Sequence, residues 1–306
     1  MDEMTLSGDA AVTPNFAQDR FRSPQGRLAK RRRVTFAPAF AITSGKGGVG
    51  KTNVAANLAA ALTQKHKRVM VIDADLGLGN LDLLLGVKPT YTLADFFTGA
   101  AALEQILVAN ENGILLLPGA SGAQEITSLR YDQKLALLTE LDAIGHEMDL
   151  VLVDTASGIS DAVTYFTTAA QEIVVVVTPE PAAMTDAYAV VKVLASAHRQ
   201  NRFWILANHV SGEQQARRLF DALSRTALRF LNASLDFLGW VPRDPYLVRA
   251  VARSQMVVLE TPESPSAQAF IRIAERLIQR AAAGVQVKGN VQFFLRRMLA
   301  AERGEQ

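Results

Sequence analysis

The stretch "SGKGGVGKT", residues 44–52, decides the fold of this 306-residue chain. It holds the full pattern G-x-x-x-x-G-K-[ST], directly after the apolar run "FAPAFAIT" at 36–43 and before an amphipathic stretch at 53–66. A glycine-rich turn between a strand and a helix lets backbone N–H groups surround phosphate oxygens at the positive end of the helix dipole. The predicted phosphate-binding residues are Gly45, Gly47, Gly48, Val49, Gly50, Lys51, Thr52 and Asn53.

The residue pattern explains only one of the two lysines in this stretch. Lys51 is the lysine of the pattern and should reach the β- and γ-phosphates, while the Thr52 hydroxyl should bind Mg²⁺. Lys46 has no part in the pattern, because a phosphate-binding loop needs only one lysine. A lysine early in a glycine-rich loop could simply be solvated, so the spacing alone leaves the role of Lys46 open.

Short apolar runs alternate with amphipathic stretches along most of the chain. Continuous runs of Val, Ile and Leu are typical of strands covered on both faces. The runs lie at 36–43, 68–75, 113–119, 149–156, 172–180, 203–210 and 236–244, and the helical stretches include 53–66, 185–199 and 268–283. This alternation predicts an α/β fold with a doubly wound, mostly parallel sheet of seven to eight strands flanked by helices.

Three segments are expected from the change in composition along the chain. Residues 1–35 predict a flexible tail that contains the basic cluster "RLAKRRR" at 27–33. This cluster is either a solvated arm or a docking segment for a protein, an acidic surface or nucleic acid. Residues 36–283 should form one P-loop ATPase domain, and 284–306 should form a linker and a final amphipathic helix.

The composition excludes several classes of protein. The chain has no cysteine, which excludes disulfides, cysteine-ligated zinc and iron–sulfur clusters. Its formal net charge is only +2, so no strong overall field favours nucleic acid. The N-terminal segment lacks the apolar core of a signal peptide, and no apolar run is long enough to span a membrane. A cytoplasmic protein is therefore expected.

Three aspartates follow predicted strands and complete the candidate site. Asp73 and Asp75 come at the end of the second strand, and Asp154 ends the run "LVLVD". An open parallel sheet presents its ligand crevice at the carboxyl ends of its strands. An Asp there is suited to hold Mg²⁺, directly or through water, although each could instead be a turn-forming residue.

The motif "KGGVGKT" at 46–52 resembles the deviant Walker A motif of the MinD/ParA family of ATPases. The resemblance implies that two copies of the chain face each other with MgATP between them. It also implies that Lys46 reaches the phosphates of the partner's nucleotide, where a cation would neutralise developing charge. The implied catalytic residues are Lys46, Lys51 and Asp75, where Asp75 orients the attacking water, and the implied metal residues are Thr52, Asp73 and Asp154.

The same resemblance suggests how ATP and ADP would be held at the base. Asn208 resembles an adenine-contacting asparagine of the family, and an amide can both donate to and accept from the base. Pro242, Arg243 and Asp244 match a segment that lines the base pocket. An Asn after a strand is also a common turn residue, so the two interpretations of Asn208 stay open.

Three further stretches resemble the flagellar FlhG/FleN branch of the family. They are "DADLGLGNLDLLLGVKPTYTLADF" at 73–96, "VVTPEPAAMTDAYAVVK" at 176–192 and "NVQFFLRRML" at 290–299. The branch implies a switch that controls flagellar number or placement. The alternatives are a MinD-type ATPase that positions the division septum and an ATP-gated anti-activator of a flagellar transcription regulator.

The C-terminal segment 290–303 predicts a basic amphipathic helix. Apolar residues share one arc and arginines lie opposite: Val291, Phe294, Leu295, Met298 and Leu299 against Arg296, Arg297 and Arg303. Such a helix is typical of an anchor on an anionic membrane surface, although it could also pack as an ordinary final helix. We expect it to cover a groove in the monomer and to be released on ATP-dependent dimerisation, which makes the protein peripherally membrane-associated in that state.

Besides a second copy of itself, the chain is expected to bind flagellar proteins. The resemblance implies an FlhF-like GTPase, flagellar switch or C-ring proteins, or a flagellar transcription activator. The segment "FAQDRFR" at 16–22 departs from the GTPase-activating motif of the branch, which puts that activity in doubt. No specific DNA binding is expected, because residues 1–33 are too short and polar for a helix-turn-helix.

Overall fold

The computed structural model describes residues 37–75, 79–119, 131–145 and 147–284. The predicted tail through residue 35, its segment 16–22 and the helix at 290–303 lie outside these residues, so the three-segment division stays a prediction. Within the described ranges, no helix combines the length and the apolar character needed to cross a bilayer.

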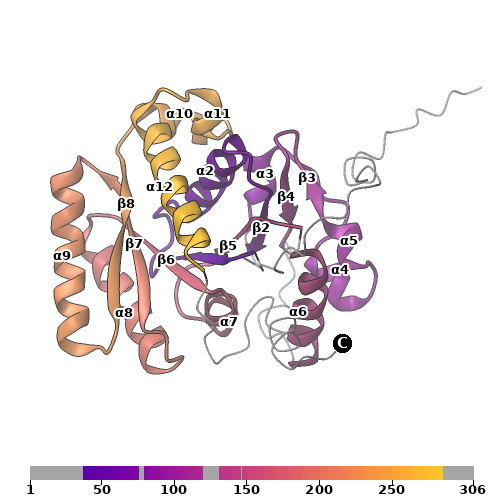
Figure 1. Ribbon diagram of the computed structural model, residues 1–306, viewed down its shortest axis with the longest axis horizontal. Coiled ribbons are helices and arrows are strands. Elements are labelled where there is room, and N and C mark those ends of the chain that lie inside the picture. Colours follow the sequence, from indigo (N-terminus) through magenta and orange to yellow (C-terminus); the bar gives the residue numbers. More distant parts are fainter. Residues whose placement is uncertain (1–36, 76–78, 120–130, 146, 285–306) are drawn as a thin grey trace, which may run out of the picture. The chain divides into compact units, whose positions relative to one another are not determined.

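The described residues form one eight-stranded sheet with the order β3-β4-β2-β5-β1-β6-β7-β8 (Figure 1). Its strands are β1 Ala39–Thr43, β2 Val69–Ala74, β3 Val108–Ala109, β4 Ile114–Leu117, β5 Leu150–Thr155, β6 Glu172–Val177, β7 Arg202–Val210 and β8 Ser234–Pro242. Neighbouring strands are parallel except β3 and β4, which pair antiparallel. The predicted fold class, a mostly parallel sheet flanked by helices, is confirmed.

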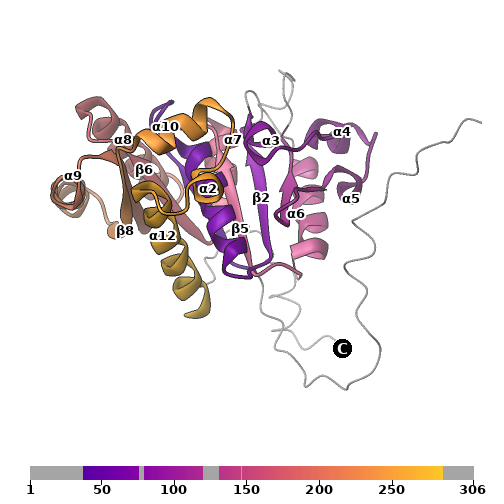
Figure 2. The same ribbon diagram turned by 90° about the horizontal axis from the view of Figure 1, so that it is seen from above.

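Helices cover both faces of the sheet. They are α2 Lys51–Gln64, α3 Leu81–Leu85, α4 Leu93–Thr98, α5 Leu103–Ile106, α6 Tyr131–Gly145, α7 Asp161–Ala169, α8 Pro181–Ser196, α9 Glu213–Phe230, α10 Pro245–Ala252, α11 Val257–Glu260 and α12 Pro265–Ala282. On one face, α2 and α12 lie side by side and share a core with α3, α10 and α11 (Figures 1 and 2). On the other face, α4 to α7 cover the β2–β5 half, while α8 and α9 cover the β6–β8 half.

The central strands are buried on both faces, which explains why apolar and polar residues did not alternate in the predicted runs. Every residue of β1, β2, β5 and β6 is buried, because helices cover both sides. β1 lies between β5 and β6 at the middle of the sheet. The chain winds in opposite directions from this strand, so the carboxyl end of β1 is the topological switch point where open α/β sheets bind ligands.

The element boundaries differ from the predicted ones in physically simple ways. α2 begins at Lys51, so the end of the glycine-rich loop is already the first turn of the helix. α8 begins at Pro181, four residues before the predicted start, since proline is favoured at the first helical position. β3 was not predicted, because a strand of two residues carries no periodicity.

Candidate active site

The phosphate loop joins the end of β1 to the start of α2, as the motif predicts. Gly50 is in a left-handed conformation at φ 90°, and a Cβ there would lie only 2.7 Å from Asn208 Nδ2. Gly50 is therefore required both by the backbone turn and by the close approach of β7. The Gly158 amide donates to the Ser44 carbonyl at 2.9 Å, which ties the loop after β5 to the phosphate loop.

Lys51 is the first residue of α2, directly after the glycines of the phosphate loop. Its side chain is buried, and burial lowers the pKa of its ammonium group, while the nearby carboxylates of Asp154 and Asp75 oppose that shift. The three residues come from α2, β5 and the end of β2, which the sheet order brings together. A partly desolvated ammonium beside two carboxylates is suited to bind phosphate oxygens whose charge is shared with a metal ion.

Asp73 and Asp154 lie directly opposite each other on the paired strands β2 and β5. Burial raises the pKa of Asp73, and the neighbouring charge of Asp154 adds to the shift. The Asp73 Oδ1 accepts the Asp75 amide at 3.1 Å, which fixes the turn after β2. Two buried carboxylates repel each other when both are ionised, so this arrangement favours a cation nearby.

The surroundings of Asp154 fit a magnesium ion. Burial raises its pKa, against the Thr52 hydroxyl, which hydrogen-bonds to it, and the Lys51 charge. Its Oδ1 is buried without a hydrogen-bond partner among the residues that the structure describes. Mg²⁺ prefers oxygen ligands and commonly uses one or two carboxylates together with substrate phosphates. In the described part of the chain, no group of three or more His, Cys, Asp or Glu side chains is arranged to hold a metal ion.

Lys46 pairs with Glu180, a residue that the sequence did not single out. Its Nζ lies 3.0 Å from Glu180 Oε2, and the two side chains are 43% and 60% exposed. Glu180 is at the N-cap position of α8, just after β6, and its side chain makes no capping hydrogen bond. The sequence could have indicated Glu180, because it follows β6, which pairs with β1, and the carboxyl ends of central strands line the ligand crevice.

The predicted base-binding residues fall into two groups. Asn208 is buried; its Nδ2 donates to the Val49 carbonyl at 2.8 Å, and its Oδ1 accepts the His209 amide at 3.0 Å. Asn208 thus braces the phosphate loop against β7. Pro242 is half-buried and Arg243 is exposed, and the Arg243 Nε donates to the His209 carbonyl at 3.0 Å. Adenine contact by these three residues stays a prediction.

Asp244 is engaged in holding helices together. Its carboxylate accepts the Tyr246 amide at 2.9 Å, which caps α10, and the Ser266 amide and hydroxyl at 2.9 and 2.6 Å at the start of α12. Burial alone would raise the pKa of Asp244, but these hydrogen bonds together with one from Ser264 outweigh it and lower the pKa. The observed contacts therefore support a structural role for this side chain, and its predicted place in a base pocket remains untested.

Comparisons with known proteins agree with this geometry. The ParA family, described as NUBPL iron-transfer P-loop NTPase, matches residues 36–278. The antiactivator FleN of Pseudomonas aeruginosa is 40% identical over 260 residues, which cover 85% of this chain and 92% of FleN. The flagellum site-determining protein YlxH of Helicobacter pylori is 32% identical over 263 residues, covering 85% and 89% of the two chains.

A solved structure extends the similarity to a nucleotide complex. The septum site-determining protein MinD of Pyrococcus horikoshii, complexed with Mg-ADP, superposes with a TM-score of 0.65 at 26% identity and covers 82% of this chain and 100% of that one. The phosphate loop, the magnesium-compatible carboxylates and these similarities are therefore mutually consistent. The family description mentions iron transfer. This chain has no cysteine and therefore no thiolate that could bind iron.

Proposed function

This chain belongs to the ParA/MinD family of P-loop NTPases, and we propose that it is an ATP-driven switch that controls flagellar number or placement. The observation that carries the ATPase assignment is the cluster of buried Lys51 and Asp154 with half-buried Thr52, whose hydroxyl hydrogen-bonds to Asp154. The flagellar assignment is supported by the similarity to YlxH and FleN and by the resemblance of 73–96 and 176–192 to the flagellar branch.

The residues of one chain would bind and orient the nucleotide. Backbone amides of 47–52 would surround the phosphates, and Lys51 would neutralise the β- and γ-phosphate oxygens. Thr52 and Asp154, with Asp73 beside them, would hold Mg²⁺, which supplies charge neutralisation at the phosphates when bound. Asp75, at the carboxyl end of β2, would accept a proton from the attacking water and orient it.

Lys46 would complete the site of a second copy. In a single chain it is paired with Glu180 at the surface, and exposed pairs of this kind contribute only about 0.2–1 kcal/mol. Breaking this weak pair, so that Lys46 can contact the phosphates of a nucleotide bound to the facing copy, therefore costs little free energy. A cation that arrives only on dimerisation would couple hydrolysis to assembly, so the ATP-bound dimer would be the active state and hydrolysis would reset it.

Membrane binding is the next element of the proposal. The segment 290–303 would anchor the dimer to anionic lipid, because two weak anchors on one particle gain from avidity. Co-sedimentation with anionic liposomes should be strongest for the full chain with ATP, weaker with ADP, and lost in both states for a chain that ends at residue 288. Equal sedimentation in all four conditions, or none for the full chain with ATP, would contradict the anchor.

The partner separates the flagellar function from its alternatives. The name antiactivator carried by FleN favours a second candidate, in which the ATP-bound chain sequesters a transcription activator. The similarity to MinD of Pyrococcus horikoshii favours a third, septum positioning. Pull-downs with purified candidates, with and without ATP, decide among them. ATP-dependent capture of flagellar switch proteins or an FlhF-like GTPase supports the proposal, whereas capture of only a septum inhibitor or only an enhancer-binding regulator supports an alternative.

A further inference from the structure

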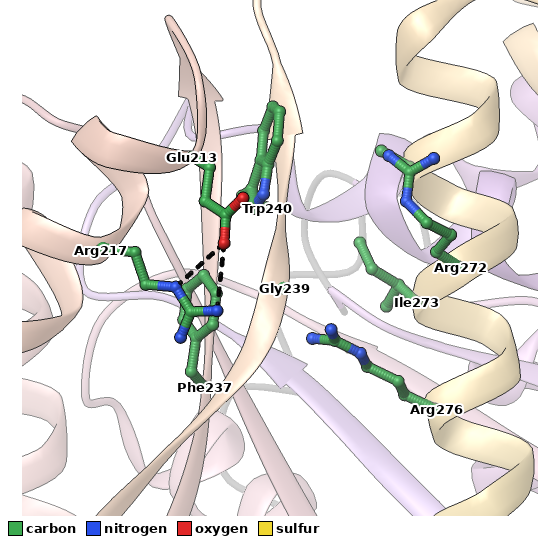
Figure 3. A pocket seen from close by; sticks show the side chains of 9 residues that line it. Glu213, Arg217, Phe237, Gly239, Trp240, Arg272, Ile273 and Arg276 are labelled. Atoms are coloured by element: carbon green, nitrogen blue, oxygen red, sulfur yellow. Dashed lines mark hydrogen bonds and ion pairs between the residues drawn. The ribbon is translucent and has the colours of Figure 1, made fainter.

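A pocket of about 320 Å³ lies at the edge of the sheet, where β8 runs between α9 and α12 (Figure 3). One wall comes from α9 and includes Glu213 and Arg217, and the other comes from α12 and includes Arg272 and Arg276. β6 and β7 separate β8 from β1, so the pocket lies roughly 14 Å to the side of the strand that carries the phosphate loop. None of the candidate catalytic residues lines it.

The pocket follows the free edge of a strand. β8 is the last strand of the sheet, with no strand paired on its outer side within the described residues. The Leu238 carbonyl, at a β-bulge in the pairing of β8 with β7, accepts a hydrogen bond from the Arg276 guanidinium. Exposed strand edges commonly bind extended peptides through main-chain hydrogen bonds unless side chains protect them. Arg276 is such a side chain.

The charges around this edge are unbalanced. Three guanidinium groups line the pocket against one carboxylate, that of Glu213. Glu213 is already paired with Arg217 at 3.1 Å, and that guanidinium also lies 4.6 Å from the centre of the Phe237 ring. Arg272 has no hydrogen bond or ion pair among the residues described here, and Arg276 is bound only to the neutral Leu238 carbonyl. Two uncompensated positive charges favour an acidic ligand.

The spacing of these charges matches an extended chain. Arg272 and Arg276 are four residues apart on α12, which separates them by about 6 Å along the helix. An extended peptide presents side chains on one side every two residues, or about 6.8 Å. Figure 3 shows Arg276 extending from α12 toward β8 near Gly239, while Arg272 lies one turn away on the same helix and also lines the pocket. Carboxylates at alternate positions of a peptide along β8 would therefore each meet one arginine.

The other side of the edge is aromatic. Leu238 and Val241 pack in the core under α12, whereas Phe237 and Trp240 pack with the core under α9. A residue between the two acidic positions would point to the α9 side and lie over these rings. We propose that the free edge of β8 binds an extended segment of a partner protein with the pattern acidic–apolar–acidic, whose carboxylates pair with Arg276 and Arg272.

The test uses the full chain and a fluorescein-labelled peptide that alternates Asp and Val. Two peptides serve as controls: one with the same composition but consecutive Asp residues, and one that alternates Lys and Val. Arg272→Ala and Arg276→Ala should each raise the Kd of the alternating acidic peptide by about tenfold, and high salt should weaken binding. Arg225→Ala, an exposed arginine on α9 outside the pocket, is the matched control and should leave the Kd unchanged.

Two further measurements distinguish strand addition from simple charge attraction. Hydrogen exchange of the β8 amides at 234–241 should slow when the alternating peptide binds, and ATP turnover of Arg272→Ala should equal that of the parent chain. Equal affinity for the peptide with consecutive Asp residues would overturn the proposal, as would unchanged binding by both pocket variants. Binding of a single-stranded oligonucleotide but not of the acidic peptide would also overturn it.

Discussion

Lys46→Ala separates a structural from a functional role of the second lysine of the phosphate loop. The variant loses the Lys46–Glu180 pair, whose atoms lie 3.0 Å apart with side chains 43% and 60% exposed. A pair so exposed contributes about 0.2–1 kcal/mol to the free energy of unfolding, so Tm should fall by no more than about 4 °C. ATP affinity should also persist, because Lys51 and the loop amides remain.

The effect of Lys46→Ala on ATP hydrolysis should be much larger than its effect on stability. A cation supplied by a second protein subunit during phosphoryl transfer accounts for roughly 10³–10⁵ in rate. ATP turnover by Lys46→Ala should therefore fall by at least about 10³, and ATP-dependent dimerisation, followed by light scattering, should be lost. The matched control is Lys65→Ala, which removes an ion pair to Glu275 with 40% and 46% exposed side chains, at the opposite end of α2 from the loop. Its turnover should equal the parent's. Parent-level hydrolysis by Lys46→Ala, or a loss of ATP affinity as large as that of Lys51→Ala, would refute the reasoning.

Three further predictions concern other parts of the chain. Asp75→Ala should bind ATP and accumulate as a dimer on size-exclusion chromatography, because water activation fails after assembly; a monomer with normal turnover would remove Asp75 from the catalytic residues. Asn57→Ala should lower the free energy of unfolding by about 1–3 kcal/mol, because the buried Val258 amide loses its acceptor at 3.2 Å, whereas Asn112→Ala at the surface should change little in the same urea titration. Asp244→Asn should cost about 1.5–3 kcal/mol at pH 7. Since the hydrogen bonds lower the pKa of Asp244 in the folded state, this contribution is complete above the unfolded value of about 3.9 and is lost as pH falls through the folded pKa, so parent and variant should converge in acid.

The sequence predicted the sheet and the phosphate site well for identifiable reasons. Buried parallel strands are continuous apolar runs, and the loop from 45 to 52 combines a residue pattern with a strand before it and a helix after it. The carboxyl ends of parallel strands meet at one edge, so Asp73 and Asp154 could be expected side by side before their pairing was seen.

The features that the sequence missed depend on contacts between distant segments. Glu180 becomes relevant only because the phosphate loop passes beside α8, 134 residues away in sequence. Asp244 became a brace between helices because Ser266 comes to it from the start of α12. The arginine pocket arises from three elements packed around an edge strand, and no periodicity in any one of them indicates it.

The central claim, that Lys46 of one copy completes the site of another, is tested most directly by mixing Lys46→Ala with Asp75→Ala. Each variant alone should be inactive. In a mixed dimer, the site with intact Asp75 and Lys51 receives Lys46 from the Asp75→Ala copy and is complete, while the other site lacks both groups. Each mixed dimer has one complete site of two and should turn over ATP at up to about half the rate of a parent dimer, so the mixture should exceed the sum of the separate variants. Turnover in the mixture no higher than the sum of the separate variants would contradict the claim.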